Sequence, residues 1–419
     1  MFIYKVKTGD SLFSIAKKYN VSVDSIRYFN EIEGDILATG HDLLIPTNYY
    51  IVQRGDTLYH ISQMSFLPIE TIRFINKLQS DLLTVGMQLY LPPRTKYNAE
   101  GFSYILPSTP EINIEKVTRF GPLNTFFGIF EYHVFEDGSL STLNDEQLIK
   151  LSHDNKVAPL AVITNLTPTG FSQELTRKIL SNPIIRDQLI NNIYNLVKSK
   201  NYAGVNIDFE RVPENQRDAY SDFLRRLRDK LKPEGYYTSV AIPPKTKDDI
   251  PWLQGYDYSG IGAAVDFVFI MAYDWHETHS LPGPVAPINE IRKTIEYALY
   301  HMPANKIFLG LQRYGYDWTM SNGTPISARA ISIENAVETA LKYNAPIQYS
   351  LEYQQPFYTY IDELGLRHIV WFGDATARSK RFQLVIDYGL RGLGAWQLGL
   401  GFVQSDFLAN EFFNIKKVL

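Results

Sequence analysis

The chain of 419 residues contains no cysteine, which excludes disulfide frameworks, thiolate zinc sites and cysteine nucleophiles. It also has no uncharged apolar run near the roughly eighteen residues that a membrane-spanning helix needs. Its net charge is only −4, without the basic excess typical of a nucleic-acid binder. We therefore expect neither a nucleic-acid partner nor a membrane segment. Hydrophobic content of 45% and charged content of 21% are those of a globular protein.

Several sequence signals of other protein classes are also missing. Residues 1–7 lack the long apolar core of a secretory signal, so we expect synthesis without a signal peptide. There is no Gly-rich phosphate loop and no serine nucleophile elbow. His276 and His279 lack the spacing of a zinc-protease helix. We expect no metal and no cofactor.

The first ninety residues contain an internal repeat with an offset of 46 residues. Its first copy has Tyr4, Val6, Gly9, Asp10, Leu12, Ile15, Ile26, Arg27, Asn30, Gly40, Leu43 and Pro46, and all twelve recur 46 residues later. Such self-similarity indicates two copies of one small module, at residues 1–47 and 48–94. Apolar spacing and turn residues predict a strand, two helices and a strand in each copy, with Asp10 and Asp56 as helix N-caps.

Residues 100–419 contain short apolar runs separated by amphipathic helical patterns. The eight runs are 102–106, 126–134, 157–164, 204–209, 237–242, 265–273, 307–311 and 392–398. Eight strands alternating with helices predict a (β/α)8 barrel. The stretch between runs seven and eight is too long for a simple loop, so we expect a small α+β insertion at roughly residues 317–368.

The fourth run ends in acidic residues. Side chains alternate along a strand, so Asn206, Asp208 and Glu210 share one face and the apolar residues between them share the other. A carboxylate pair at the end of a rigid strand suits acid–base chemistry on a glycosidic bond. The alternative is a buried ion pair with barrel Arg or Lys residues.

Two other runs end in residues suited to a sugar site. Run six ends in Met271-Ala272-Tyr273-Asp274, and run eight contains Trp396. Because the carboxyl ends of barrel strands form the active site, we expect these side chains to meet Asp208 and Glu210. Tyr314 is a further candidate for lining a sugar subsite.

These motifs resemble two known families. The opening Val-x-x-Gly-Asp-[Ser/Thr]-Leu-x-x-Ile of both repeats is similar to LysM modules, which have a βααβ fold and bind N-acetylglucosamine polymers. The strand ends resemble glycoside hydrolase family 18, whose Asp-x-x-Asp-x-Asp-x-Glu signature matches at Asp208 and Glu210. Its first two acids fall on Ala203 and Asn206. With LysM modules in front, this form is similar to the SleL/YaaH-type cortex-lytic N-acetylglucosaminidases of spores.

The resemblance implies a role for each site residue. Glu210 would be the general acid, while Asp208 and Tyr273 would orient the substrate's acetamido group for attack on carbon one. Asn206 would fix the Asp208 carboxylate. Asn206, Asp274, Trp396 and Tyr314 are the expected substrate-binding residues.

The resemblance also implies a function. We expect a peptidoglycan hydrolase of the spore cortex, a retaining N-acetylglucosaminidase active during germination, located in the spore and monomeric. Its partner would be cortex glycan, bound by the modules and the barrel cleft. Two alternatives stay open: a chitinase, and a non-catalytic glycan-binding coat protein.

Overall fold

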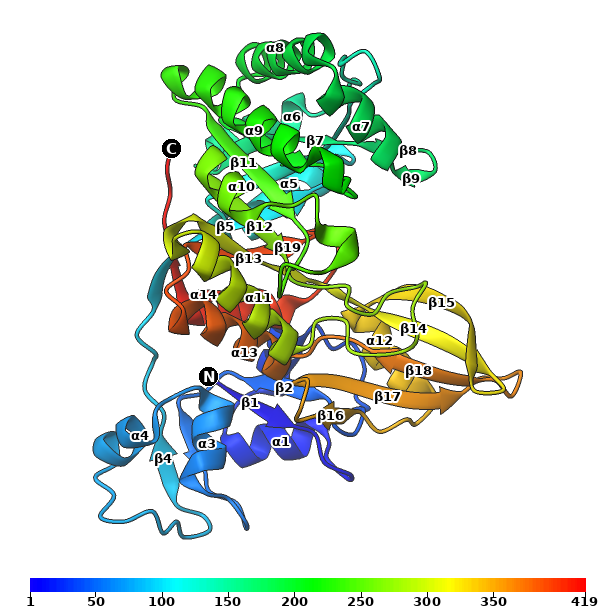
Figure 1. Cartoon of the computed structure of the whole chain (residues 1–419). Coiled ribbons are helices and arrows are strands. Elements are labelled where there is room, and N and C mark those ends of the chain that lie inside the picture. The colour runs from blue at the N-terminus through cyan, green and yellow to red at the C-terminus, as the bar shows by residue number, and fades with distance from the viewer.

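The structure is a computed structural model that describes residues 1–419 (Figure 1). Two small modules at the N-terminus pack beside a closed barrel, and a five-stranded sheet extends from the barrel (Figure 1). No helix in the chain combines the length and the apolar character needed to cross a lipid bilayer.

Each repeat forms a two-stranded antiparallel sheet with two helices, as predicted. The elements are β1 (Phe2–Lys5), α1 (Leu12–Tyr19), α2 (Val23–Asn30) and β2 (Asp42–Ile45), then β3 (Tyr49–Ile51), α3 (Leu58–Ser65), α4 (Ile69–Ile75) and β4 (Gln88–Tyr90). The prediction of Asp10 as an N-cap was wrong by one residue. The cap of α1 is Ser11, whose hydroxyl accepts from the amide of Ser14.

The aspartates of the two repeats brace a turn instead. Asp10 accepts hydrogen bonds from the Lys7 amide and the Tyr4 hydroxyl, both at 2.7 Å. Asp56 makes the same two contacts in the second repeat, where Thr57 is the N-cap of α3. The Gly-Asp pair is therefore a turn signal, and the hydroxyl residue after it begins the helix.

Eight parallel strands form the barrel. They are β5 (Tyr97–Ile105), β6 (Phe126–His133), β7 (Ala158–Thr164), β10 (Gly204–Asp208), β11 (Tyr237–Ile242), β12 (Phe267–Met271), β13 (Ile307–Gln312) and β19 (Gly392–Trp396). Pairing of β19 with β5 closes the barrel, and the short strand β20 (Phe413–Ile415) pairs with the N-terminal residues of β5. The predicted (β/α)8 architecture is confirmed.

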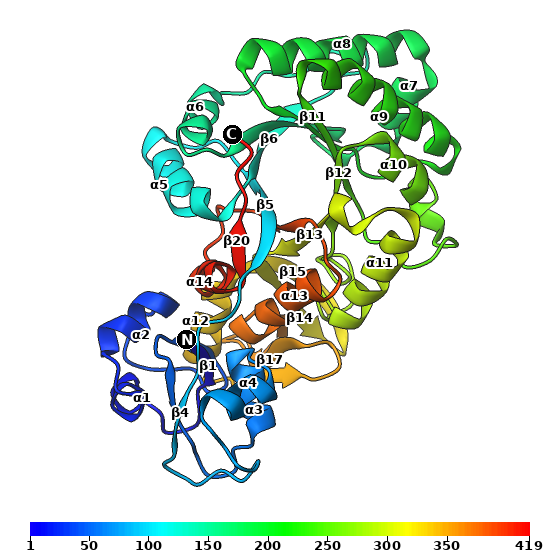
Figure 2. The ribbon, with the colours of Figure 1, turned by 90° about the vertical axis from the view of Figure 1, so that its left-hand side faces the viewer.

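Helices surround the strands on the outside (Figure 2). They are α5 (Pro110–Phe120), α6 (Glu146–Asp154), α7 (Gln173–Ser181), α8 (Pro183–Lys200), α9 (Arg217–Leu231), α10 (Tyr258–Ala264), α11 (Ile288–His301), α13 (Ala375–Asp387) and α14 (Val403–Phe412). Short 3-10 turns lie at Gly121–Leu123, Glu214–Gln216, Lys232–Glu234, Pro251–Leu253 and Ala304–Lys306, and a small hairpin pairs β8 (Leu166–Thr167) with β9 (Gly170–Phe171).

The insertion lies between the last two barrel strands. It contains β14 (Tyr314–Ser321), β15 (Thr324–Ser332), α12 (Ile333–Lys342), β16 (Gln348–Ser350), β17 (Gln355–Ile361) and β18 (Arg367–Trp371). All five strands form one antiparallel sheet, on which α12 packs through Ile333, Ala336 and Ala340.

The first module is bound directly to the barrel domain. The amide of Gln404 on α14 donates to the Asn30 side chain at 2.8 Å and to the Asp42 carbonyl at 2.6 Å. The backbone amide of Thr376 on α13 donates to the Asp42 carboxylate at 2.9 Å. Phe29 packs on Phe407 with ring centroids 4.2 Å apart. These contacts fix the module against α13 and α14.

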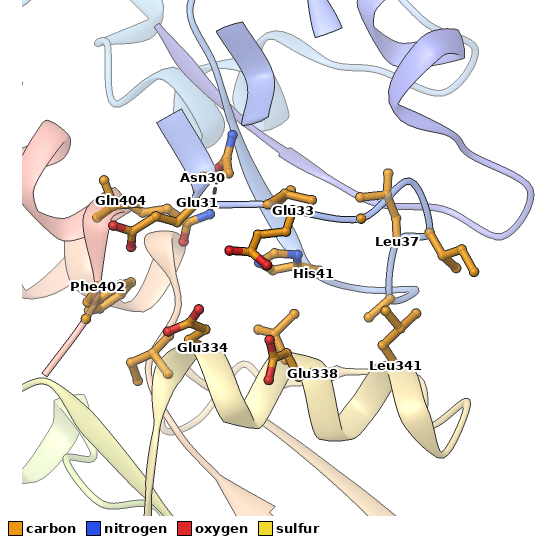
Figure 3. Close-up of a pocket in the computed structure, with 18 residues that line it drawn as sticks. Asn30, Glu31, Glu33, Leu37, His41, Glu334, Glu338, Leu341, Phe402 and Gln404 are labelled. Atoms are coloured by element: carbon orange, nitrogen blue, oxygen red, sulfur yellow. Dashed lines mark hydrogen bonds between the residues drawn. The ribbon is translucent and has the colours of Figure 1, made fainter. Parts of the chain in front are cut away.

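A small acidic cavity separates the first module from α12 (Figure 3). Glu31 and Glu33 of the module face Glu334 and Glu338 of α12, with His41 between them. Burial and the charges of the other three glutamates raise the pKa of Glu334. The docking contacts therefore outweigh a repulsion between like charges across this part of the interface.

Candidate active site

The two faces of β10 lie in different environments, as the alternation predicts. Phe209, just after the strand, stacks on Phe223 of α9 with ring centroids 6.0 Å apart, so this face meets the helix layer. Asn206 and Asp208 point into the barrel, and Glu210 follows at its mouth. The strand thereby carries two carboxylates to the carboxyl end of the barrel.

The backbone around Glu210 is fixed from both sides. Asn165, at the end of β7, accepts from the Glu210 amide at 2.9 Å and donates to the Glu210 carbonyl at 2.7 Å. The Tyr256 hydroxyl donates to the Phe209 carbonyl at 2.9 Å. The Glu210 side chain is thus held at a defined position while its carboxylate stays free for a ligand.

Asn206 makes different contacts from those expected. Its side-chain oxygen accepts from the Tyr104 hydroxyl at 2.9 Å, and its amide donates to the Ser239 hydroxyl at 3.0 Å. No hydrogen bond joins it to Asp208, so the expectation that it directly fixes that carboxylate was wrong. Both polar groups of this fully buried side chain are satisfied inside the barrel, beneath the site.

The two carboxyl groups have raised pKa values. Burial, the charge of Asp274 and the opposing effect of Arg211 together set the pKa of Glu210 at about 7. Burial raises the pKa of Asp208 well above its usual range, and the charges of Glu210 and Glu131 add to this rise. A glutamate that is half protonated at neutral pH is suited to general acid catalysis.

Strand β12 brings two of the predicted residues to the same place. Tyr273 is buried, and its hydroxyl pKa is raised by burial and by the charges of Asp274 and Asp208. The Asp274 carboxylate accepts from the Tyr314 hydroxyl at 2.8 Å and from the Tyr316 hydroxyl at 3.1 Å. The residue is exposed, yet burial of its carboxylate raises its pKa to about 6, opposed by the hydrogen bonds from the two tyrosines.

Trp396 lies at the end of β19, beside strand ends from the first half of the barrel. Its ring packs edge-on against Phe130 at 4.7 Å and Tyr104 at 5.4 Å between centroids. The side chain is half-buried, so one part of the ring is available to a ligand. In the strand order it is two strands from β12 and opposite β10.

A cleft of about 640 Å³ opens beside these strand ends. Glu210, Tyr273 and Asp274 line it, whereas Asp208, only 4% exposed, lies behind Glu210. The volume is in the range of sites for small ligands. No group of three or more His, Asp or Glu side chains in the chain is arranged to hold a metal ion.

Four site residues were missed by the sequence analysis. Asn165, Tyr256 and Trp252 come from loops or strand ends with no local acidic pattern; Trp252 is 75% exposed on the cleft wall. Glu131, two residues before the end of β6, is the fourth. Its signal was a carboxylate in an otherwise aromatic strand end, Phe130-Glu131-Tyr132, which could have been noted.

Comparisons with known proteins agree with this geometry. Residues 125–401 match Glycosyl hydrolases family 18, and residues 4–46 and 50–92 each match the LysM domain. Over the full length of both chains, the chain is 46% identical to a Bacillus subtilis protein that carries the provisional name sporulation-specific glycosylase YdhD. It is 42% identical to the cortical fragment-lytic enzyme of the same organism, covering 100% of this chain and 99% of that one.

A solved structure is similar over nearly the whole length. The crystal structure of the Bacillus cereus spore cortex-lytic enzyme SleL superposes with a TM-score of 0.89 at 35% identity, covering 99% of each chain. The matched family region includes all eight barrel strands except β5. This chain belongs to glycoside hydrolase family 18 and carries two LysM domains at its N-terminus.

Proposed function

We propose that the protein is a spore-cortex hydrolase, a retaining N-acetylglucosaminidase that acts by substrate-assisted catalysis during germination. The observation that carries the proposal is Glu210, a carboxyl group with a pKa of about 7 at the mouth of the barrel, beside buried Asp208. Full-length similarity to proteins named cortical fragment-lytic enzymes supports the choice of polymer.

In the proposed reaction, Glu210 donates its proton to the leaving oxygen as the bond from that oxygen to carbon one breaks. The carbonyl oxygen of the substrate's own 2-acetamido group bonds to carbon one and forms an oxazolinium ion. Asp208 accepts the acetamido N–H and stabilises the positive charge. Water then attacks carbon one as the bond from carbon one to the acetamido oxygen breaks, and the water gives a proton to Glu210. Two inversions leave the configuration retained.

The remaining residues would position the sugar. The Tyr273 hydroxyl would donate to the acetamido oxygen, and Asp274 and Tyr314 would bind through their shared hydrogen-bonded cluster. Trp396 would provide an apolar floor beneath the acetamido methyl group. Asn206 would act from beneath the site, through its hydrogen bonds to the Tyr104 and Ser239 hydroxyls.

This mechanism restricts the sugar that is cleaved. The residue at the scissile bond must carry a free N-acetyl group, and muramic lactam, whose nitrogen is tied into a ring, cannot supply one. Cleavage therefore follows N-acetylglucosamine, which appears at the new reducing ends. Mass spectrometry of digested cortex checks this, and another sugar at those ends would contradict the mechanism.

The modules would keep the enzyme on its polymer. The LysM domains would bind cortex glycan, and the enzyme would reside in the spore as a monomer. Neutral charge in residues 1–94, with nine basic and nine acidic side chains, favours recognition by hydrogen bonding and stacking rather than by charge.

Replacement of Glu210 by Gln tests the proposal. Loss of the general acid is expected to reduce hydrolysis of cortex fragments by about a hundred- to ten-thousandfold, while binding to the polymer persists. Glu363→Gln, at a residue of the insertion whose side chain is 65% exposed, is the matched control and should hydrolyse normally. Unchanged turnover in the Glu210 variant would refute the assignment, and faster release from chitin than from cortex would favour the chitinase alternative.

A further inference from the structure

A cation and an aromatic ring on the wall of the cleft have no partner within the protein. They are Arg211 and Trp252, which both line the cleft of about 640 Å³ and are both exposed. The proposed mechanism gives neither of them a contact with the substrate. The role inferred for them rests on that proposed function and concerns the leaving sugar that the same site selects.

The Arg211 guanidinium makes no ion pair and no hydrogen bond. By contrast, Arg177, which lines an adjacent pocket with it, lies 2.5 Å from Glu174. Arg211 is the only basic side chain among the residues that line the cleft. Its charge works against the general acid, because it lowers the pKa of Glu210. A free cation beside an acid that must stay protonated indicates that an anion of the ligand pairs with it.

Trp252 lies on a short turn in the loop after β11. The turn spans Pro251–Leu253 and is anchored by Leu253, which is buried. The side-chain amide of Gln254 donates to the Ile250 carbonyl at 3.0 Å and closes the turn. No other aromatic ring packs on the indole, which is 75% exposed. An exposed indole on a fixed turn is suited to stacking on a sugar ring.

The loops that carry the cation and the ring are fixed to each other. The Tyr256 hydroxyl donates to the Phe209 carbonyl at 2.9 Å and accepts from the Val212 amide at 3.4 Å. These two backbone groups flank Arg211 in the chain. A methyl group at Gly255 would lie 2.1 Å from the Val212 carbonyl oxygen, so the two backbones are in close contact. The guanidinium and the indole are therefore carried by one rigid wall.

The cleft lies on the side of Glu210 that receives the leaving group. In the proposed reaction the cleaved sugar lies over Trp396 and beside Asp208, and neither of these residues lines the cleft. Most of the lining comes from residues that follow β10, β11 and β12, whereas β19, which carries Trp396, is opposite β10 in the strand order. Glu210 protonates the oxygen between the two sugars, so the cleft beyond it holds the sugar that leaves.

We propose that Arg211 and Trp252 select a leaving sugar that carries a carboxylate, with Arg211 bound to the carboxylate and Trp252 stacked on the ring. Muramic acid is such a sugar, because its lactyl group ends in a carboxylate, either free or extended by a peptide that ends in another. The lactyl group is on carbon three, next to the carbon-four oxygen that leaves, just as Arg211 is next to Glu210. Muramic lactam and the sugars of chitin have no carboxylate at this place.

The test uses two tetrasaccharides of alternating N-acetylglucosamine and N-acetylmuramic acid, one with free lactyl carboxylates and one with these converted to methylamides. At about pH 5.5 Glu210 is protonated and the lactyl groups are ionised, so the Glu210 pKa does not affect the comparison. We expect the wild type to have a kcat/KM about fivefold higher on the carboxylate form. Arg211→Gln should abolish this preference by lowering kcat/KM on that form alone.

Two further variants separate recognition of charge from other effects. Arg211→Lys keeps a cation without the planar fork and should retain part of the preference. Trp252→Ala should raise KM about fivefold on both forms without changing their ratio. Arg225→Gln is the matched control, because this arginine is paired with Asp222 and Asp229 on α9 and does not line the cleft.

The outcomes distinguish the inference from the proposed function. A wild type without a preference, or an Arg211→Gln variant that keeps the wild-type ratio, would overturn the inference and leave the proposed function intact. A KM that does not change in Trp252→Ala would overturn the stacking role. Activity on the methylamide form shows that each variant is folded. Failure of the wild type to cleave either form would refute the proposed function instead.

Discussion

The protonation of Glu210 depends on neighbours of both signs. Burial and Asp274 raise its pKa, whereas Arg211, the next residue, lowers it, and the result is a value of about 7. Arg211 has a φ of 56°, in the left-handed region, and the segment that contains it is held by Asn165 and Tyr256. The strained backbone thus keeps a cation near the acid.

The pH dependence follows from this arrangement. A general acid must be protonated, so kcat/KM is expected to fall as the pH rises through about 7. In Arg211→Gln the cation that lowers the Glu210 pKa is absent, so the alkaline limb should move to higher pH by about half a unit. Arg217→Gln, more distant and paired with Asp257, is the control for a pH-rate profile. A limb that moves to lower pH, or not at all, would contradict the assignment.

The sequence contained enough to find Asp208 and Glu210 but not their support. Strand alternation and the family signature are both patterns within a single strand, in which Asp208 and Glu210 are two residues apart. Tyr104 on β5 and Asn165 just after β7 come from other parts of the chain, and only the closed barrel brings them to β10. The contacts of Asn206 were mispredicted for the same reason, since Tyr104 lies across the barrel on β5 and Ser239 lies on the neighbouring strand β11.

At the scale of elements, barrel closure depends on close approach between β19 and β5. A methyl group at Gly394 would lie 1.7 Å from the Phe102 carbonyl oxygen and 2.5 Å from the Phe269 ring. Backbone and a packed aromatic ring cannot both move away. Gly394 therefore allows the last strand to join the first, two residues before Trp396.

Substitution at this position should open the barrel seam. Gly394→Ala is expected to lower the free energy of unfolding by about 3 kcal/mol or more, at the upper end for overpacked cores. Gly34→Ala is the matched control, because a methyl group there would have no atom within 4 Å. The φ of Gly34 also lies outside the left-handed region that favours glycine. Urea denaturation compares the two, and equal midpoints would show that the seam can relax.

The strands of the barrel were predictable because each is a short apolar run between polar helices. The insertion was predictable only as excess length between two runs. Its five-stranded sheet spans Tyr314–Trp371, and it includes Tyr314, which contacts the active site. No local pattern indicates which sheet edge meets the barrel, because that depends on packing between distant segments.

At the scale of the whole molecule, a lysine and two buried carboxylates tie the first module to the barrel domain. Lys5 Nζ lies 2.6 Å from Asp42 and 4.0 Å from Asp374, the N-cap of α13. Burial and the Asp42 charge raise the pKa of Asp374 to about 8, whereas Lys5 and Thr376 lower that of Asp42. One lysine thus lies between two carboxylates and is closer to Asp42. Asp374 therefore favours its protonated form.

This predicts a pH-dependent stability. The folded-state pKa of Asp374 is above its unfolded value near 3.9, so its contribution is fully present below that pH and is lost as the pH rises through about 8. Asp374→Asn keeps the helix cap but cannot ionise. The variant is expected to gain thermal stability relative to the wild type as the pH increases from about 5 to 9. A difference in melting temperature between variant and wild type that stays constant at all pH values would show that Asp374 is already charged in the folded protein.

Rigid attachment of the modules also determines how the enzyme can meet a long polymer. A tethered binding domain samples many separations from its catalytic partner, and linker length sets how often the two engage one strand. Here Gln404, Thr376 and Lys5 clamp the first module, and Arg94 stacks on Phe412 at 3.8 Å beside the second. The LysM modules and the active site therefore keep a fixed distance and orientation relative to each other.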